Sequence, residues 1–140
     1  MDLNEIYTEL IMQHNMSKHN KRDMTDHDKC EMGHNPSCGD EISLQIKFDG
    51  DVISDLSYNG KGCAISQASA SMMIDLIKGK TREEAQILIK TFLKMITREN
   101  ENEEELMKLQ DAMVFQNIKN MPSRVKCAVL AWHTLQLLID

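Results

Sequence analysis

The strongest constraint on the fold is a pair of alternating segments joined by the residues DGD at positions 49–51. Before this turn, apolar side chains occupy every second position, and the alternation continues over residues 52–58. A period of two residues is typical of a half-buried strand, and an Asp-Gly pair favours a tight hairpin turn. The sequence therefore predicts a β-hairpin whose first strand buries Ile42, Leu44, Ile46 and Phe48.

Helical periodicity replaces this alternation after the hairpin. Residues 64–78 carry an apolar stripe, and Gly79 is placed to end a helix there. Thr81 and Glu84 have the spacing of a capping box, which predicts the start of the next helix. Pro122 marks the start of a last helix. The predicted inner faces are Ile65, Ala68, Met72 and Leu76; then Ala85, Leu88, Ile89, Phe92 and Ile96; and finally Val125, Ala128, Val129, Trp132, Leu135 and Ile139.

The remaining segments complete an α+β plan. We expect an N-terminal helix within residues 1–16, a polar loop over 17–30 and a short strand near 30–34. Residues 98–105, RENENEEE, predict a solvated acidic connector, followed by a short helix to about residue 116. The expected fold is one domain over residues 1–140, with a small three-stranded antiparallel sheet packed against a layer of about five helices.

Charge and hydropathy exclude some classes of partner. The net charge of −6 argues against nucleic acid as the main partner. The apolar run at residues 128–132 is far too short to span a membrane, and the acidic N-terminus is unlike a secretory signal. We therefore expect no membrane partner and a cytoplasmic location. There the four cysteines would be reduced, which favours metal binding or redox chemistry over disulfides.

Three cysteines lie at the boundaries or flanks of predicted elements. Cys38 lies in the turn PSCGD, and Cys63 directly precedes a helix, where the positive end of the helix dipole favours a thiolate. Cys127 is one turn into the last helix, away from the centre of its apolar stripe. With Asp40, these residues supply four ligands that suit zinc. The alternative is that the cysteines are small buried hydrophobic residues. The chain has no CxxC pair, so the spacing of the cysteines alone is weak evidence for a metal site.

Other chemical groups are weaker candidates. The segment GKG at 60–62 lacks the remaining positions of a phosphate-binding loop, and a sharp strand-to-helix turn explains its glycines. His34 could reach a metal at Cys38, although a solvated histidine is the simpler interpretation. Cys30 is interpreted as structural. The other histidines are dispersed along the sequence and need no role; they are His14, His19, His27 and His133.

Three blocks of sequence together resemble the U-type iron–sulfur cluster assembly proteins. They read NPSCGDEISL, YNGKGCAISQASASMMIDLIKGKT and MPSRVKCAVLAWHTL, and they occur in the family's order. The resemblance implies an α+β fold and a metal site formed by Cys38, Asp40, Cys63 and Cys127. It therefore selects the four residues that the positional argument proposed.

Two features make the chain similar to the SufU branch of this family. The scaffold branch has histidine directly before its last cysteine, whereas Lys126 stands here. The scaffold branch is also shorter between its second and third cysteines than residues 64–126 of this chain. For the SufU branch, the resemblance implies a zinc-dependent sulfurtransferase. Its partners would be a pyridoxal-phosphate cysteine desulfurase of the SufS type and a downstream cluster-assembly scaffold.

The resemblance also assigns roles to residues. If a desulfurase group displaces Cys38 from zinc, the freed thiolate can attack the partner's persulfide. Arg124 matches the family arginine and could stabilise thiolate or persulfide charge or pair with Asp40, while a plain surface arginine is the alternative. The chain departs from the family near the first helix, where Gln13 replaces an aspartate and Lys18 a proline. This departure affects the expected docking surface rather than the metal site.

Two other functions use the same four residues. One is a scaffold that holds iron or a transient iron–sulfur cluster in place of zinc. The other is a structural zinc module, whose loss of metal unfolds the chain while no sulfur is carried.

Overall fold

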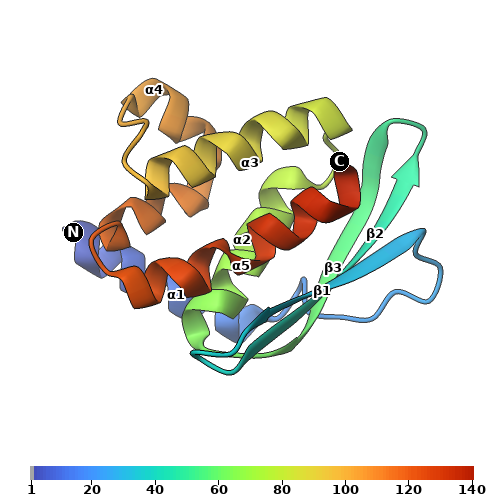
Figure 1. Cartoon of the computed structure of the whole chain (residues 1–140), viewed down its shortest axis with the longest axis horizontal. Coiled ribbons are helices and arrows are strands. Elements are labelled where there is room, and N and C mark those ends of the chain that lie inside the picture. Colours follow the sequence, from blue (N-terminus) through green and yellow to red (C-terminus); the bar gives the residue numbers. More distant parts are fainter. Residues whose placement is uncertain (1) are drawn as a thin grey trace.

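The computed structural model describes residues 2–140, apart from the side chain of Leu3. Of the helix predicted within residues 1–16, Met1 lies outside the described residues. Figure 1 shows a small sheet with helices gathered against it. The elements in chain order are α1 (Leu3–Ser17), β1 (Lys29–Asn35), β2 (Asp40–Asp49), β3 (Val52–Lys61), α2 (Ala64–Ile77), α3 (Arg82–Ile96), α4 (Glu103–Leu106), the 3₁₀ helix η1 (Met107–Ile118) and α5 (Pro122–Ile139). This arrangement confirms the predicted α+β fold.

The sheet is antiparallel throughout, in the order β1-β2-β3. Strand β2 is central and alternates as predicted, because Ile42, Leu44 and Ile46 are fully buried while the residues between them are partly exposed. Residues 36–39 form the turn between β1 and β2, with Asn35 paired to Asp40 across it. A register shift at Lys47 and Phe48 bends the β2–β3 pair near the second turn. The first turn thus follows directly on a continuous β1–β2 ladder.

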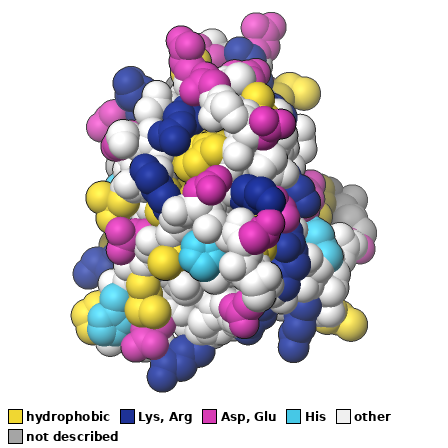
Figure 2. All heavy atoms as spheres, turned by 90° about the vertical axis from the view of Figure 1, so that its right-hand side faces the viewer, with side chains coloured by type: hydrophobic (Ala, Val, Ile, Leu, Met, Phe, Trp, Pro, Cys, Tyr) yellow, Lys and Arg dark blue, Asp and Glu magenta, His cyan; other side chains and the backbone are white. Residues whose placement is uncertain are grey.

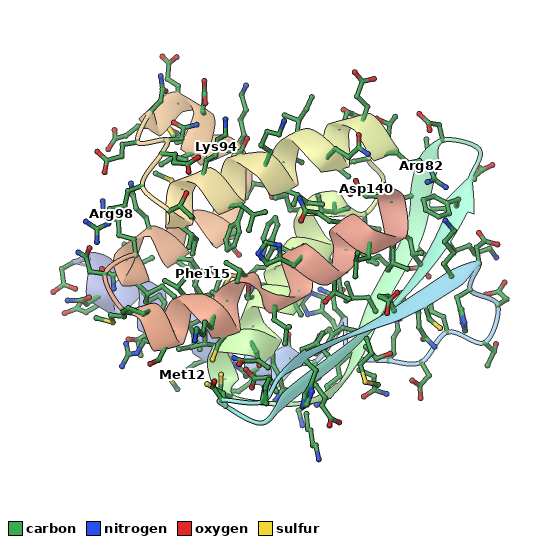
Figure 3. All side chains as sticks on the ribbon, viewed as in Figure 1. Met12, Arg82, Lys94, Arg98, Phe115 and Asp140 are labelled. Carbon is green, nitrogen blue, oxygen red and sulfur yellow. The ribbon has the colours of Figure 1, made fainter. Side chains whose placement is uncertain are left out.

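Helices α2 and α5 join the sheet to the outer helical layer. Helix α5 contacts β1 and β2, and α2 contacts β3 and α5. The Trp132 ring of α5 stacks on Phe92 of α3, with centroids 3.9 Å apart and an interplanar angle of 4°. Phe115 meets Phe92 edge-on and lies among the helices in Figure 3. The same view shows Arg82 at the N-terminal end of α3, where its guanidinium carbon lies 3.9 Å from the centroid of the Phe48 ring.

The polar loop after α1 is bound to the sheet. Its backbone pairs with β3, because Tyr58 donates to the Asn20 carbonyl at 3.0 Å and Arg22 donates to the Tyr58 carbonyl at 3.0 Å. Met24 is buried, and its N–H donates to Gln45 Oε1 at 2.6 Å. The loop therefore covers part of the sheet and supports the outer edge of β3.

Three sequence-based boundaries need correction. The predicted acidic connector at 98–105 is too long, because α4 already begins at Glu103, capped by the side chain of Asn102. The short helix predicted to about residue 116 is a 3₁₀ segment that reaches Ile118 and is interrupted at Gln110, which has φ 54°. The strand expected at 30–34 is longer by one residue at each end.

The surface carries charges of both signs. On the face shown in Figure 2, Lys and Arg side chains are interspersed with Asp and Glu side chains. Within residues 2–140, no helix combines the length and apolar character needed to cross a membrane.

Candidate metal centre

Cys38 lies on a turn, as its sequence context predicted, and this turn joins β1 to β2 and leaves the residue exposed. Its N–H donates to the Asn35 carbonyl at 3.3 Å, which closes the turn. Gly39 follows with φ +70°, a conformation that glycine adopts without strain. The hairpin thus holds the thiol at the surface on a short, defined loop.

Asp40 begins β2 and is completely buried. Its Oδ1 accepts a hydrogen bond from the Cys63 N–H at 2.8 Å, and its Oδ2 accepts one from Asn35 Nδ2 at 3.4 Å. No lysine, arginine or histidine in the described part of the chain forms an ion pair with it. A buried carboxylate is costly without a compensating charge, so this site favours a cation.

Cys63 is the N-cap residue of α2. Its Sγ accepts a hydrogen bond from the Ser66 N–H at 3.4 Å, while its own N–H binds Asp40. The preceding Gly62 has no room for a side chain, because a Cβ there would lie 2.5 Å from Asp40 Oδ1 and 2.6 Å from Ser66 Oγ. The glycine before the helix therefore allows Asp40 and the start of α2 to approach each other.

Cys127 is 3% exposed on α5, and its Sγ lies 3.2 Å from the Sγ of Cys38. The sequence placed Cys127 away from the centre of the apolar stripe of its helix, and the residue is nevertheless buried. Burial raises the pKa of Cys127 far above the usual thiol value, and its contacts with Cys38, Cys63 and Asp40 raise it further. Without a cation, the site holds Cys127 as a neutral thiol.

The four predicted ligands come from three separate parts of the chain. One ligand atom each from Cys38, Asp40 and Cys127 lies within 4.8 Å of the other two. Cys63 adjoins this group through its hydrogen bond to Asp40 and its contact with Cys127. Three sulfurs and one carboxylate match the donors that zinc accepts in tetrahedral sites, so the residues present fit a zinc ion.

Arg124 is exposed on the first turn of α5 and makes no ion pair with Asp40 among the residues the structure describes. The nearby group is Tyr7 of α1, whose buried hydroxyl lacks a hydrogen-bond partner within residues 2–140. Burial raises the pKa of Tyr7, and the positive charge of Arg124 opposes that rise. Arg124 is therefore an exposed residue three positions before Cys127 on α5, and the group on which its charge acts is Tyr7.

The other thiol and the nearest histidine lie apart from the centre. Cys30, which was interpreted as structural, is exposed on β1, and its cross-strand neighbour is Gln45. His34 is also exposed on β1, where its Nε2 lies 3.9 Å from Glu41. The interpretation of His34 as a solvated histidine is thus supported over that of a metal ligand.

The expectation that the remaining histidines are dispersed is wrong for one pair. The rings of His14 and His19 have centroids 5.9 Å apart, and both lie near Asp75 of α2. Sequence reasoning missed this cluster because α2 contributes its third member from far along the chain. The spacing of His14 and His19 was the only available signal, and it is weak by itself.

A comparison with models of protein families shows which family this chain belongs to. The model described as the NifU-like N terminal domain matches residues 6–128, which include all four candidate ligands. The chain belongs to this family. Its fold, with a three-stranded sheet and five α-helices, is the IscU/SufU fold of the NifU-like N-terminal domains.

Similar family members carry two different functional names. The chain is 38% identical over 135 residues to the zinc-dependent sulfurtransferase SufU of Bacillus subtilis, covering 96% of this chain and 90% of that protein. It is 43% identical over 131 residues to the iron-sulfur cluster assembly scaffold protein IscU of Thermotoga maritima, covering 94% of this chain and 90% of that protein.

A solved structure shares the whole fold. It is the crystal structure of a candidate iron-sulfur cluster assembly scaffold protein for the SUF system from Fervidobacterium islandicum AW-1. The two chains have a TM-score of 0.89 and 40% sequence identity, with 97% of this chain and 98% of the other covered. The fold and family of this NifU-like domain are thus established over nearly its full length.

Proposed function

We propose that this NifU-like domain is a zinc-dependent sulfur acceptor that receives persulfide sulfur from a pyridoxal-phosphate cysteine desulfurase and passes it on toward cluster assembly. The observation that carries the proposal is the exposed thiol of Cys38 beside buried Cys127 and Asp40. Cys38 faces solvent, Cys63 is half-buried, and Cys127 and Asp40 are held inside the fold. The name of the B. subtilis relative is consistent with this role.

Zinc bound by Cys38, Asp40, Cys63 and Cys127 would supply charge compensation for the carboxylate and keep the thiols deprotonated. The chain's own contribution is to fix the ligands. The Cys63 N–H orients Asp40, and Gly62 leaves space for that contact. Cys63 and Cys127 are anchored on helices, so Cys38 is the ligand that can leave with the smallest structural change.

Sulfur transfer to Cys38 balances without any added oxidant. The Cys38 thiolate attacks the terminal sulfur of a cysteine persulfide on the desulfurase, and a new S–S bond forms on Cys38. The S–S bond in the desulfurase breaks, and its cysteine leaves as a thiolate. The proton on the transferred sulfur stays with it. Exposure of Cys38 on a turn allows the partner's persulfide to approach.

Arg124 is proposed to stabilise negative charge on the thiolate or persulfide of Cys38. It is exposed one turn before Cys127 on α5, and its positive charge opposes the raised pKa of Tyr7. Replacing Arg124 by Ala should slow sulfur transfer while zinc content stays the same, and Arg124→Lys should restore part of the rate. The exposed neighbour Lys126, changed to Ala, is the control. Equal rates of sulfur transfer in Arg124→Ala, Arg124→Lys and Lys126→Ala would contradict this role of Arg124.

The main experiment measures desulfurase turnover with and without this protein, together with the mass of the protein after the reaction. Wild type should stimulate turnover and gain the mass of one sulfur atom on Cys38. Cys38→Ala should lose both effects. Cys30→Ala is a matched control, because Cys30 is equally an exposed thiol on the same hairpin but lies away from the centre.

The outcomes separate the competing functions. A zinc-bound protein that leaves turnover unchanged and never carries sulfur would be a structural zinc module. The name of the T. maritima relative supports a second candidate, a scaffold that assembles an iron–sulfur cluster on the same residues. In that case, anaerobic reconstitution should give a stable coloured cluster that moves to an apo acceptor protein. Elemental analysis of purified wild type beside Asp40→Ala tests the metal itself.

A further inference from the structure

A second group of potential metal ligands lies outside the cysteine centre. It comprises His14 of α1, His19 of the following loop and Asp75 of α2, and one ligand atom from each lies within 4.8 Å of the other two. Asp75 is twelve residues along α2 from its N-cap Cys63, a distance of about 18 Å at 1.5 Å per residue. The two groups are therefore separate sites on the same helix.

Both histidine rings are held by serine hydroxyls at the same nitrogen. His14 Nδ1 lies 2.8 Å from Ser71 Oγ, and His19 Nδ1 lies 2.7 Å from Ser17 Oγ. When each Nδ1–H donates to its serine, each Nε2 carries a lone pair, and the lone pair of His19 Nε2 can accept from Asn20 Nδ2, which lies 3.1 Å away. A metal-binding histidine commonly has this arrangement, in which the second ring nitrogen donates to a fixed acceptor and orients the ring.

Each Nε2 atom faces a carboxylate. His19 Nε2 lies 3.0 and 3.1 Å from the two oxygens of Asp75, and His14 Nε2 lies 3.3 Å from Asp111 Oδ2. A lone pair and a carboxylate repel each other at this distance unless a hydrogen atom or a cation lies between them. Either an Nε2–H that donates to the carboxylate or a metal ion bound by both would remove the repulsion.

The environment suits a divalent cation. His14 is buried, whereas His19, Asp75 and Asp111 are exposed, so the group is anchored on one side and open on the other. His14, His19 and Asp75 line a surface hollow of about 550 Å³, which gives an ion a path of entry. Two neutral imidazoles and one carboxylate are donors that suit zinc or cobalt, and the nearby carboxylate of Asp111 adds a second negative charge.

We propose that His14, His19 and Asp75 form a second binding site for a divalent cation such as Zn²⁺ or Co²⁺. The three ligands come from α1, the loop after it and α2, and Asp111 of η1 adds a negative charge beside His14. An ion bound there links these elements and stabilises the fold by binding only the folded chain. The proposal is independent of sulfur transfer at Cys38.

Cobalt binding tests the proposal, because its spectrum reports the ligand type. Cobalt bound by thiolates gives an intense charge-transfer band, whereas cobalt bound by histidine and carboxylate gives only weak d–d bands. Adding Co²⁺ to the protein as purified should produce d–d bands without further thiolate charge transfer, saturating at one ion per chain. The ion should also raise the unfolding temperature.

Matched variants locate the site. His19→Ala and Asp75→Asn should each weaken this Co²⁺ binding by ~10-fold or more, and Ser17→Ala should weaken it by ~10-fold through loss of ring orientation. His133→Ala is the control, because His133 is an exposed histidine bonded to a surface glutamine, Gln136. Unfolding curves recorded in chelator verify that each variant is folded.

Three results would overturn the proposal. The first is the absence of d–d bands beyond those of thiolate-bound cobalt, which would leave a proton between each Nε2 and its carboxylate. The second is a cobalt signal that His19→Ala and Asp75→Asn leave at full strength. The third is an equal loss in the control His133→Ala, which would indicate scattered surface binding.

Discussion

The Sγ atoms of Cys38 and Cys127 lie 3.2 Å apart, although 89 positions separate the two residues in the sequence. Cys38 reaches this point on the β1–β2 turn, and Cys127 reaches it on the first turns of α5. Packing of α5 against β1 and β2 makes the contact. An exposed thiol thus touches a buried one, and each thiol can share either a metal ion or, once oxidised, a covalent bond.

Removing the metal and adding a mild thiol oxidant such as diamide should join Cys38 to Cys127. Two thiols lose their hydrogens to the oxidant, and an intramolecular disulfide forms because the sulfurs are already adjacent. Peptide mapping without reduction should find this cross-link, with Cys30 still free. Zinc-loaded protein is the control and should react much more slowly. A cross-link to Cys30 under the same conditions would contradict the arrangement.

Gly62→Ala should disrupt the centre without unfolding the chain. The new Cβ would lie 2.5 Å from Asp40 Oδ1, so the carboxylate would have to move, and zinc affinity should fall by ~10-fold or more. Competition with a coloured chelator measures the affinity. Gly50→Ala is the comparison, because Gly50 has φ +61° in open space. It should cost about 1–2 kcal/mol of unfolding free energy and leave zinc affinity unchanged.

Asp40→Asn should change stability in opposite directions with and without metal. The side chain is fully buried, so removing its charge should stabilise the metal-free protein by on the order of 1 kcal/mol. The amide oxygen can still accept from the Cys63 N–H. In the presence of zinc, the variant should be less stable than wild type, because it binds the ion more weakly. Urea unfolding in chelator and in zinc gives both values. A loss of stability in both conditions would contradict the charge argument.

The fold followed from sequence wherever periodicity and turn residues agreed. The alternation of Ile42, Leu44 and Ile46 predicted β2, and the Thr81–Glu84 capping box is formed at the start of α3. Segments without a simple period were predicted less well. The η1 segment was not recognisable as a 3₁₀ helix, because its irregularity at Gln110 depends on packing against other helices rather than on a local motif.

The candidate centre was predictable for a different reason. Cys38 and Cys63 each stand beside glycines at the end of a predicted element, so their positions could be inferred locally. The hydrogen bond between Asp40 and the Cys63 backbone could not, since it requires the tertiary approach that Gly62 permits. The pair of His14 and His19 with Asp75 depends likewise on packing of α1 against α2, which sequence spacing does not show.

A buried hydrogen bond between α2 and α5 should matter for holding Cys63 and Cys127 at one place. Trp132 Nε1–H donates to Ser69 Oγ at 2.9 Å, and the Ser69 hydroxyl donates to the Ala128 carbonyl at 2.6 Å. Ser69→Ala should cost about 1–3 kcal/mol, because it leaves a buried indole N–H unpaired. Trp132→Phe should lower the unfolding free energy by less in the Ser69→Ala background than in the wild type. Urea unfolding of the four proteins in this cycle measures the coupling, and simple additivity would contradict the contact.

Stability at low pH should depend on Asp55. Partial burial opposes ionisation of this carboxyl, but hydrogen bonds from Arg22 and Lys78 outweigh it and hold its pKa below the usual range. Because the folded-state pKa is depressed, the stabilisation is present above the unfolded-state pKa of about 3.9 and is lost as pH falls through the folded-state value. Asp55→Asn should therefore lower the unfolding free energy by about 0.5–1 kcal/mol at pH 7 and by progressively less below pH 4. Asp26→Asn removes the exposed pair with Lys47 and serves as the control, since its effect should disappear in high salt while that of Asp55→Asn largely remains. A wild-type advantage over Asp55→Asn that grows as the solution is acidified would contradict the sign of the shift.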